Sequence, residues 1–295
     1  MKNELQLIRL YVLVCELYDT RRRTCFQRLS NNTNPNGMTD QEVVTIYWFG
    51  HLHQRFEKKA IYEFVQTYWL ERFPKLPAYQ TFVARLNRLE ATFQSLGAEL
   101  NARLQAGHVP EIDHVIDSLP VMLARGGHAY SATVAREGLA DVGYCASKKL
   151  YFHGVRLHAV AQRRSGQLPR PHQIWVREGS CHDVRSVKEQ APVLPNTTLI
   201  GDSAYADDEF KEHLAAQGSQ LNTPRKKPKG KELSQLEKHH KRCVSRLRQP
   251  IEGLFNWFND KTDLQNAGTV RSEDALMVHC FGKLAFAYFL LVFNP

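Results

Sequence analysis

The sequence predicts an α/β domain that follows a helical N-terminal region. Up to about residue 106, apolar residues recur at the three-to-four spacing of helices, whereas short β-rich segments separated by turns begin near residue 110. A long helical pattern then fills the C-terminal part. Strands interleaved with helices are typical of an α/β fold. We therefore expect two domains, residues 1–106 and residues 107–295.

Helical signals recur through the first of these domains. Thr39-Asp-Gln-Glu42 is a capping box ahead of an apolar run, and further helices are expected over residues 58–72 and 79–104. Two helices, a proline-marked turn and a third helix that carries Arg85 and Arg88 would suit a helix-turn-helix that binds DNA. A helical bundle with solvated arginines explains the same spacing equally well.

The second domain carries the strand signals. Strands are expected over residues 112–116, 150–161, 173–176 and 197–200, with short helices from His182-Asp183 and over residues 207–217. Residues 276–293 are strongly apolar but are interrupted by His279, Gly282 and Lys283, and their uninterrupted part is too short to span a bilayer. We expect a buried closing helix there.

Composition and charge narrow the functional classes. The 295 residues are 43% hydrophobic and 23% charged, which is the balance of a soluble globular protein. The net charge of +9 favours a polyanionic partner such as nucleic acid. Six widely spaced cysteines include no Cys-x-x-Cys pair, so we expect reduced thiols in the cytoplasm. The N-terminus lacks the uninterrupted apolar core of a signal peptide.

Most of the positive charge lies in one stretch. Residues 225–248 hold ten Lys or Arg against two acids. Such a run would bind DNA phosphates in a salt-sensitive way, although a solvated flexible loop has the same composition. The candidate DNA-binding residues of this stretch are Arg225, Lys226, Lys227, Lys229, Lys231, Lys241, Arg242 and Arg248.

Two aspartates stand where strands are expected to end. Asp117 closes Ile112-Asp-His-Val-Ile-Asp117, and Asp202 closes Thr197-Thr-Leu-Ile-Gly-Asp202. Strand ends are where α/β proteins place reactive side chains, and neighbouring strands would bring the two carboxylates together. Because like charges repel there, a hard divalent cation such as Mg²⁺ would stabilise the pair.

Glu252 is the third candidate carboxylate. Pro250 suits the first turn of a helix, and the apolar residues after it form a stripe with Glu252 at its edge. From that edge the side chain could reach a metal ion. A surface glutamate stabilised by the helix dipole is the other interpretation of this position.

The three acidic segments together resemble a known family. Ile116-Asp-Ser-Leu-Pro-Val121, Gly201-Asp-Ser-Ala-Tyr205 and Arg248-x-x-x-Glu252 are similar to the motifs of bacterial insertion-sequence DDE transposases. Lys149-Leu-Tyr-Phe-His-Gly-Val-Arg-Leu-His158 and His182-Asp183 most resemble the group named after insertion sequence nine-eight-two.

This resemblance implies an RNase H-like catalytic domain, a central mixed sheet flanked by helices, behind the all-helical N-terminal domain. It implies that Asp117, Asp202 and Glu252 hold two Mg²⁺ ions, for which Mn²⁺ can substitute. The implied activity is phosphodiester hydrolysis at transposon ends followed by attack of the 3′-hydroxyl on target DNA. The implied partner is double-stranded DNA, bound by a homodimer, with no membrane and no small-molecule substrate.

The sequence departs from the related pattern Y-x-x-R-x-x-x-E-x-x-x-x-x-x-K at two positions. Arg248 fits, but Ser245 stands at the tyrosine and Asn259 at the lysine. Lys261, two residues further on, is the candidate to replace the missing lysine in contacting DNA.

Other functions fit parts of the sequence. Gly201-Asp-Ser203 is similar to the nucleophile segment of some serine hydrolases, but the Asp-x-x-His that they carry near the C-terminus is absent. A non-catalytic DNA-binding protein would use the N-terminal region alone. Another RNase H-like nuclease or a resolvase would share the metal chemistry without strand transfer.

Overall fold

The structure is a computed structural model and describes residues 2–21, 37–136, 138–225 and 234–293. It divides into two compact units, which we call the helical unit (residues 1–106 and 258–295) and the sheet unit (residues 107–257). The division after residue 106 lies at the expected domain boundary. Residues 258–295, assigned from sequence to the second domain, pack instead with the N-terminal helices. The functions assigned to the two domains remain predictions.

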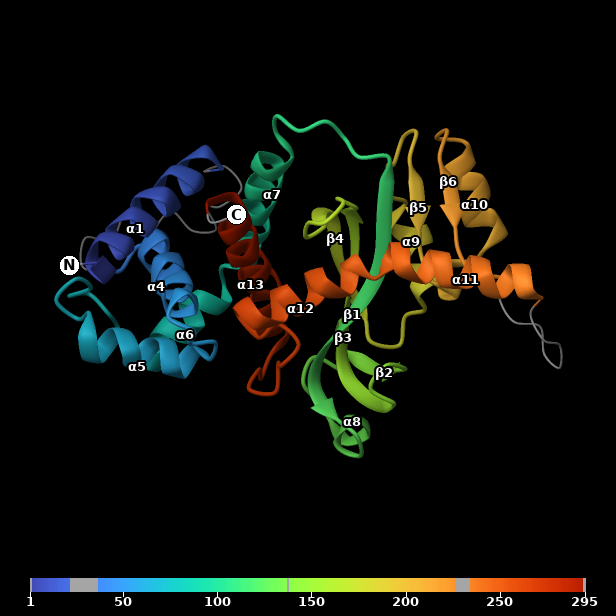
Figure 1. The fold of residues 1–295 in the computed structure, drawn as a ribbon. Helices are drawn as coiled ribbons and strands as arrows, with labels where there is room; N and C mark the ends of the chain where they lie inside the picture. The colour runs from blue at the N-terminus through green and yellow to red at the C-terminus, as the bar shows by residue number, and fades with distance from the viewer. Residues whose placement is uncertain (1, 22–36, 137, 226–233, 294–295) are drawn as a thin grey trace. The chain divides into compact units, whose positions relative to one another are not determined.

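The helical unit is built from helices (Figure 1), and its buried core is rich in aromatic residues. The core includes Trp48, whose ring centroid lies 5.5 Å from that of Phe289. The helices are α1 (Lys2–Thr20), α4 (Asp40–Leu52), α5 (Lys58–Tyr68), α6 (Tyr79–Asn87), α7 (Glu90–Gln105) and α13 (Glu273–Phe293).

Helix α13 is the expected closing helix, and most of its residues are buried. It is long and apolar enough to cross a membrane by length and composition, and 72% of its most apolar window is buried inside the structure. The indole of Trp48 donates a hydrogen bond of 3.3 Å to the backbone carbonyl of Gly282. This interior glycine lets the two helices approach closely, because a Cβ at Gly282 would lie 2.9 Å from the Tyr47 ring.

The N-terminal helices confirm one local prediction and correct another. Thr39 and Glu42 form the expected reciprocal capping box at the start of α4. The prediction of a single helix over residues 79–104 is wrong, because the helix is interrupted between the end of α6 and the start of α7. The Arg88 and Leu89 N–H groups bond three residues back, to Arg85 and Leu86, in a tighter turn than an α-helix allows.

The sheet unit contains a mixed sheet with strand order β2-β3-β1-β5-β6, and β4 also pairs with β3. Strand β1 runs antiparallel to β3 and parallel to β5. The two halves of β3 pair with different strands, the first with β2 and the second with β4. The strands are β1 (Asp113–Arg125), β2 (Asp141–Cys145), β3 (Leu150–Gln162), β4 (Arg170–Glu178), β5 (Thr198–Ile200) and β6 (Gln220–Asn222).

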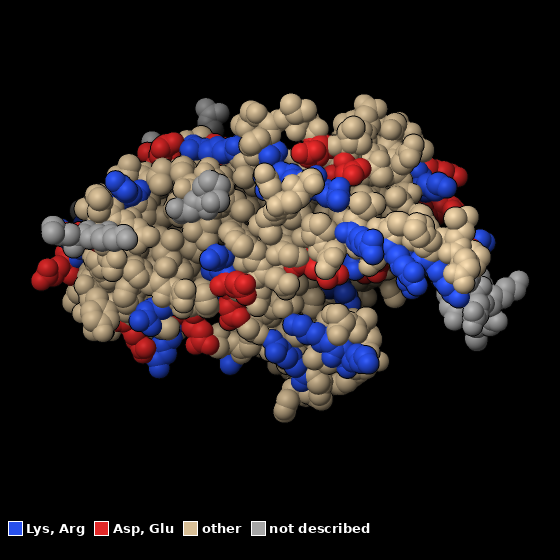
Figure 2. Space-filling view, in the orientation of Figure 1, with Lys and Arg blue, Asp and Glu red and all other residues tan. Residues whose placement is uncertain are grey.

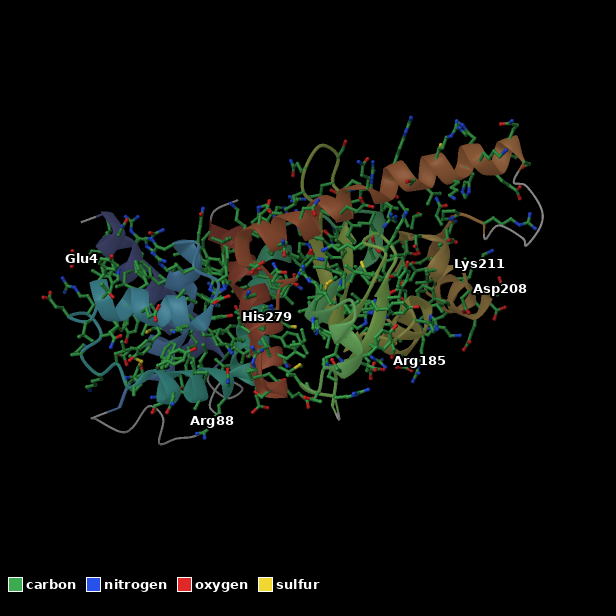
Figure 3. The ribbon with its side chains drawn as sticks, turned by 90° about the horizontal axis from the view of Figure 1, so that it is seen from below. Glu4, Arg88, Arg185, Asp208, Lys211 and His279 are labelled. Atoms are coloured by element: carbon green, nitrogen blue, oxygen red, sulfur yellow. The ribbon has the colours of Figure 1, made fainter. Side chains whose placement is uncertain are left out.

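Helices cover both faces of this sheet, as Figures 1 and 3 show from two directions. Helices α9 (Asp183–Gln190) and α10 (Asp208–Ala215) pack on one face through a core that includes Val187, Phe210 and Leu214. Helix α11 (Gln235–Arg248) crosses the other face, over β1 and β5. A mixed sheet flanked by helices, following an all-helical N-terminal region in the chain, is the expected RNase H-like α/β arrangement.

The strands differ from the sequence-based expectation in length and number. Strand β1 does not end at Asp117 but continues through Pro120 to Arg125. Pro120 fits in the strand because β1 passes beyond the end of β5 there, so no neighbour on that side needs its missing N–H. Strands β2 and β6 were not expected, because each is short and carries little alternation of apolar and polar residues.

Candidate active site

The parallel pairing of β1 with β5 brings Asp117 and Asp202 to one place. The pairing ends at Val115 and Ile200, so both aspartates follow two positions beyond it. Asp202 caps the short helix η1 (Ser203–Tyr205), and its Oδ1 accepts a hydrogen bond of 2.7 Å from the Ala204 N–H. Asp117 lies inside strand β1, just beyond the point where its pairing with β5 ends.

Asp117 is partly buried, and its charge is not fully compensated. Burial raises its pKa to about 7, and the neighbouring carboxylates of Asp202 and Asp183 contribute to the rise. The guanidinium of Arg248 and the Ser118 N–H, which lies 2.9 Å from Oδ1, act in the opposite direction. A carboxyl with such a pKa is half-protonated near neutral pH unless a further cation stabilises the charged form.

Arg248 joins Asp117 to Glu252. It is the last residue of α11, and its guanidinium donates one hydrogen bond to Asp117 and another, of 2.9 Å, to Oε1 of Glu252. Glu252 lies in the first turn of α12 (Pro250–Thr262), which begins at the expected proline. The three acids singled out from the sequence thus surround one edge of the sheet: Asp117 and Glu252 share a guanidinium, and Asp202 acts electrostatically on Asp117.

Asp183 is a fourth carboxyl group at this edge, to which no role was assigned from the sequence. It begins α9, and burial raises its pKa, with a further contribution from Asp202. Its Oδ1 is buried and has no hydrogen-bond partner among the described residues. The signal was present in the sequence, because His182-Asp183 belongs to the family-like pattern, but only the fold shows that Asp183 faces Asp117 and Asp202.

His158 lies behind Asp183 on β3. Its Nδ1 is 3.7 Å from Oδ1 of Asp183, and its ring stacks on Trp175 with centroids 5.5 Å apart. The side chain is fully buried, and burial, followed by the charges of Arg156 and Arg177, lowers its pKa to about 3. A neutral imidazole has one N–H, so His158 can present it to Asp183 without adding a charge.

Arg156 provides a fixed positive charge beside these acids. Its guanidinium donates to the backbone oxygens of Gly179, at 3.0 Å, and Tyr144, at 2.6 Å, and lies 3.4 Å from the Ser118 hydroxyl. It opposes the rise in the pKa of Asp183. Because its hydrogen bonds go to backbone carbonyls, Arg156 is held in place by the sheet.

The donor atoms suit a hard divalent cation. Asp117, Asp183, Asp202 and Glu252 offer only carboxylate oxygens, which Mg²⁺ and Mn²⁺ prefer. Burial and the neighbouring carboxylates raise the pKa values of Asp117 and Asp183 despite Arg248 and Arg156, so a bound cation would stabilise their charged forms. Among the described residues no three of these side chains are already arranged as a metal site, and Arg248 pairs with both Asp117 and Glu252.

A family model described as a transposase DDE domain matches residues 115–290. The chain belongs to this family. The match spans Asp117, Asp202 and Glu252 and leaves the hydrolase interpretation of Gly201-Asp-Ser203 without support. Comparisons with curated proteins and with solved structures find no match. The insertion sequence nine-eight-two group remains a prediction.

The DDE domain also carries most of the basic residues expected to contact DNA. Lys226, Lys227, Lys229 and Lys231 lie outside the described residues. Arg225 is exposed and pairs with Glu237 at 3.0 Å. Lys241 and Arg242 are exposed on α11, where Figure 2 shows Lys and Arg side chains gathered along the helix. Their contact with DNA remains a prediction.

The remaining basic candidates have distinct environments. Arg88 is exposed on the outside of the helical unit (Figure 3). Arg85 instead forms a largely buried ion pair of 2.7 Å with Asp40, which gives it a structural role inside that unit. Lys261 is exposed on α12 but lies nine residues after Glu252, which at 100° per residue is the opposite side of the helix. Asn259, seven residues on, shares the face of Glu252.

Proposed function

We propose that this transposase acts for a bacterial insertion sequence, and that it cleaves the element's ends and joins them to target DNA. The observation that carries the proposal is the convergence of Asp117, Asp202 and Glu252 at one sheet edge, with Arg248 bridging the first and last. Three carboxylates brought together from distant parts of the chain match the DDE family that the sequence belongs to.

We assign to these three carboxylates two divalent ions, Mg²⁺ in the cell, with Mn²⁺ as a substitute. The bound pair would supply activation of the attacking oxygen and stabilisation of the leaving oxygen. Asp117 must lose its proton to contribute a full charge, which its raised pKa makes dependent on added positive charge. With ions bound, Arg248 would give up its hydrogen bonds to Asp117 and Glu252, and its guanidinium would be available to a DNA phosphate.

Asp183 supports the same site from the other side. Its carboxyl interacts electrostatically with Asp117 and Asp202, and its buried Oδ1, which has no hydrogen-bond partner among the described residues, lies 3.7 Å from Nδ1 of the neutral His158. We therefore add Asp183 to the proposed carboxylate set, either as a direct ligand or through hydrogen bonds to the water shell that Mg²⁺ retains.

The basic residues of α11 and of residues 225–231 would hold DNA phosphates next to these acids. Double-stranded DNA, both transposon end and target, is the proposed partner, bound by a homodimer. Because this substrate is chromosomal, we place the protein in the bacterial cytoplasm, associated with the nucleoid.

A cleavage and strand-transfer assay on the element's own ends tests the proposal. We expect cleavage and joining to a second duplex with Mg²⁺ or Mn²⁺, and neither in EDTA. Cleavage without joining would identify another nuclease or a resolvase, and DNA binding without metal-dependent cleavage would identify a non-catalytic binding protein. Either outcome contradicts the proposal.

A further inference from the structure

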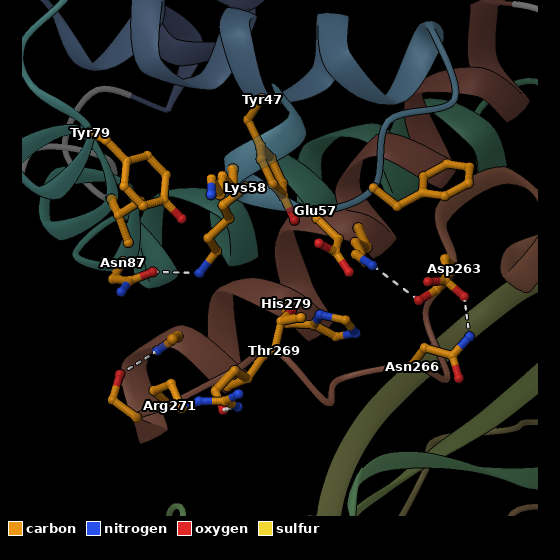
Figure 4. Close-up of a pocket in the computed structure, with 17 residues that line it drawn as sticks. Tyr47, Glu57, Lys58, Tyr79, Asn87, Asp263, Asn266, Thr269, Arg271 and His279 are labelled. Carbon is orange, nitrogen blue, oxygen red and sulfur yellow. Dashed lines mark hydrogen bonds between the residues drawn. The ribbon is translucent and has the colours of Figure 1, made fainter. Parts of the chain in front are cut away.

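A cavity of about 390 Å³ lies within the helical unit (Figure 4). Its wall is formed by Tyr47 of α4, the N-terminal end of α5, one side of α6, residues between 263 and 272, and helix α13. Cationic side chains outnumber anionic ones there. The charged lining residues are Lys58, Lys59, Arg271 and Lys283 against Glu57 and Asp263.

Lys283 is the most deeply placed of these cations. Only 2% of it is exposed, and its amine donates a hydrogen bond of 3.0 Å to the backbone carbonyl of Asp263. Among the described residues no carboxylate oxygen lies within ion-pair distance of the amine. Burial lowers its pKa to about 7, with a further contribution from the charge of Lys58. A charged ammonium has three donors, so this group has capacity for an anionic acceptor.

Lys58 reaches the cavity from the first turn of α5. Its amine donates to the side-chain oxygen of Asn87, as Figure 4 shows, and burial lowers its pKa to about 8. Burial is the main cause of the lowered pKa in both lysines. Glu57 and Asp263 are too far from Lys283 to form an ion pair with it, although both raise its pKa.

The helix that carries Lys58 adds positive potential. Helix α5 has 11 residues, and the side chain of its N-cap, Glu57, makes no capping hydrogen bond. The N-terminus of a helix presents backbone N–H groups and the positive end of the dipole, which favour an anion. A dipole end and two poorly compensated lysines therefore meet at one cavity.

We propose that this cavity binds a phosphate group between Lys58 and Lys283. A phosphate carries more charge than a carboxylate and offers oxygens in several directions, so it suits a cavity lined by more than one ammonium group. The cavity volume is sufficient for a phosphate with an attached sugar or base. The group could belong to a free phosphate compound or to a DNA backbone, and the test separates these sources. The proposal does not depend on the carboxylate site.

Calorimetric titration of the full-length protein with inorganic phosphate, at ionic strength matched with NaCl, is the experiment. We expect saturable binding to the wild type, and binding at least about tenfold weaker in Lys283→Met and in Lys58→Met. Lys283→Arg should retain binding because it keeps the charge. Lys75→Met is the matched control, since Lys75 is an exposed lysine of the helical unit that does not line the cavity, and it should bind as the wild type does.

A repeat titration in the presence of duplex DNA assigns the source. Loss of phosphate binding would mean that a DNA phosphate occupies the cavity, and unchanged binding would mean a free phosphate compound. The proposal is overturned if the wild type shows no saturable binding or if Lys283→Met binds phosphate as tightly as the wild type. Should Lys283→Met fail to fold, the partly exposed Lys58→Met decides on the same criterion.

Discussion

Arg248 donates a hydrogen bond to Asp117, although 131 positions separate the two residues in the chain. The same guanidinium donates to Glu252, four positions further on. A permanent positive charge therefore stands between two of the three acids assigned to metal binding. If the proposed ions bind these acids, Arg248 would compete with them for Asp117 and Glu252.

The competition predicts the effect of Arg248→Gln on metal affinity. Without DNA, we expect Mn²⁺ to bind roughly three- to tenfold more tightly, because removing a nearby positive charge makes the site more negative. Strand transfer should fall, since the guanidinium is also assigned to a DNA phosphate. Titration followed by electron paramagnetic resonance measures the affinity. Arg185 is an exposed arginine on α9, and Arg185→Gln is the control that should leave Mn²⁺ affinity and strand transfer unchanged. Weaker Mn²⁺ binding in Arg248→Gln would contradict the competition.

The raised pKa of Asp117 predicts how stability varies with pH in EDTA. Its folded-state pKa of about 7 lies above the usual carboxyl value, so the folded state holds a proton that the unfolded state has lost. The contribution of Asp117 to the free energy of unfolding is therefore present at low pH and is lost as the pH rises from about 4 to 7. The slope from this group is at most about 1.4 kcal/mol per pH unit.

Chemical unfolding between pH 5 and pH 8 measures this effect. Asp117→Asn should flatten the pH dependence, because the amide does not titrate and still fits beside the charged neighbours Arg248, Asp183 and Asp202. A saturating divalent ion should remove the loss at high pH. An identical pH slope in wild type and Asp117→Asn would show that other groups cause it.

Asp183 is expected to contribute to metal binding without being one of the three family acids. Asp183→Asn should lower Mn²⁺ affinity about tenfold, in the range typical of groups that support metal ligands. Asp208→Asn is a matched control, because Asp208 also begins an eight-residue helix but is exposed. Unchanged affinity in Asp183→Asn would limit this residue to a structural role at the start of α9.

Helix α11 should bind DNA through its exposed basic residues. Lys241→Gln and Arg242→Gln should each weaken binding to specific and nonspecific duplexes alike and reduce the slope of log K against log salt by about one. Fluorescence anisotropy over a range of NaCl concentrations measures both quantities. Lys211→Gln, an exposed lysine on α10, provides the comparison (Figure 3). If the slope of log K against log salt is the same in both α11 variants as in the wild type, DNA does not contact these two residues.

Local sequence signals identified the elements that depend on neighbouring residues. The capping box at Thr39, the strand at Leu150 and the helix start at Pro250 each follow from a few adjacent side chains, and the structure confirms all three. The length of β1 did not follow, because Pro120 is tolerated only where its neighbour β5 has ended. Where β5 ends beside β1 depends on the pairing of segments that are distant in the sequence, so adjacent residues do not reveal it.

The site shows the same division. The segments around Asp117, Asp202 and Glu252 are recognisable in the sequence, but the position of Asp183 beside them depends on how α9 packs on the sheet. For Lys261, closeness in sequence did not predict the position in the structure. Proximity in sequence suggested that it could replace the lysine missing at Asn259, whereas a continuous α12 puts it on the opposite side of the helix.

Asp117, Asp202 and Glu252 are proposed to act together on DNA phosphodiesters. Cleavage of the element's own ends by Asp117→Asn, Asp202→Asn and Glu252→Gln, with DNA binding measured in parallel, tests this most directly. We predict that all three variants bind DNA as the wild type does and that none cleaves it with Mg²⁺. Full cleavage by Glu252→Gln would contradict the account of the site.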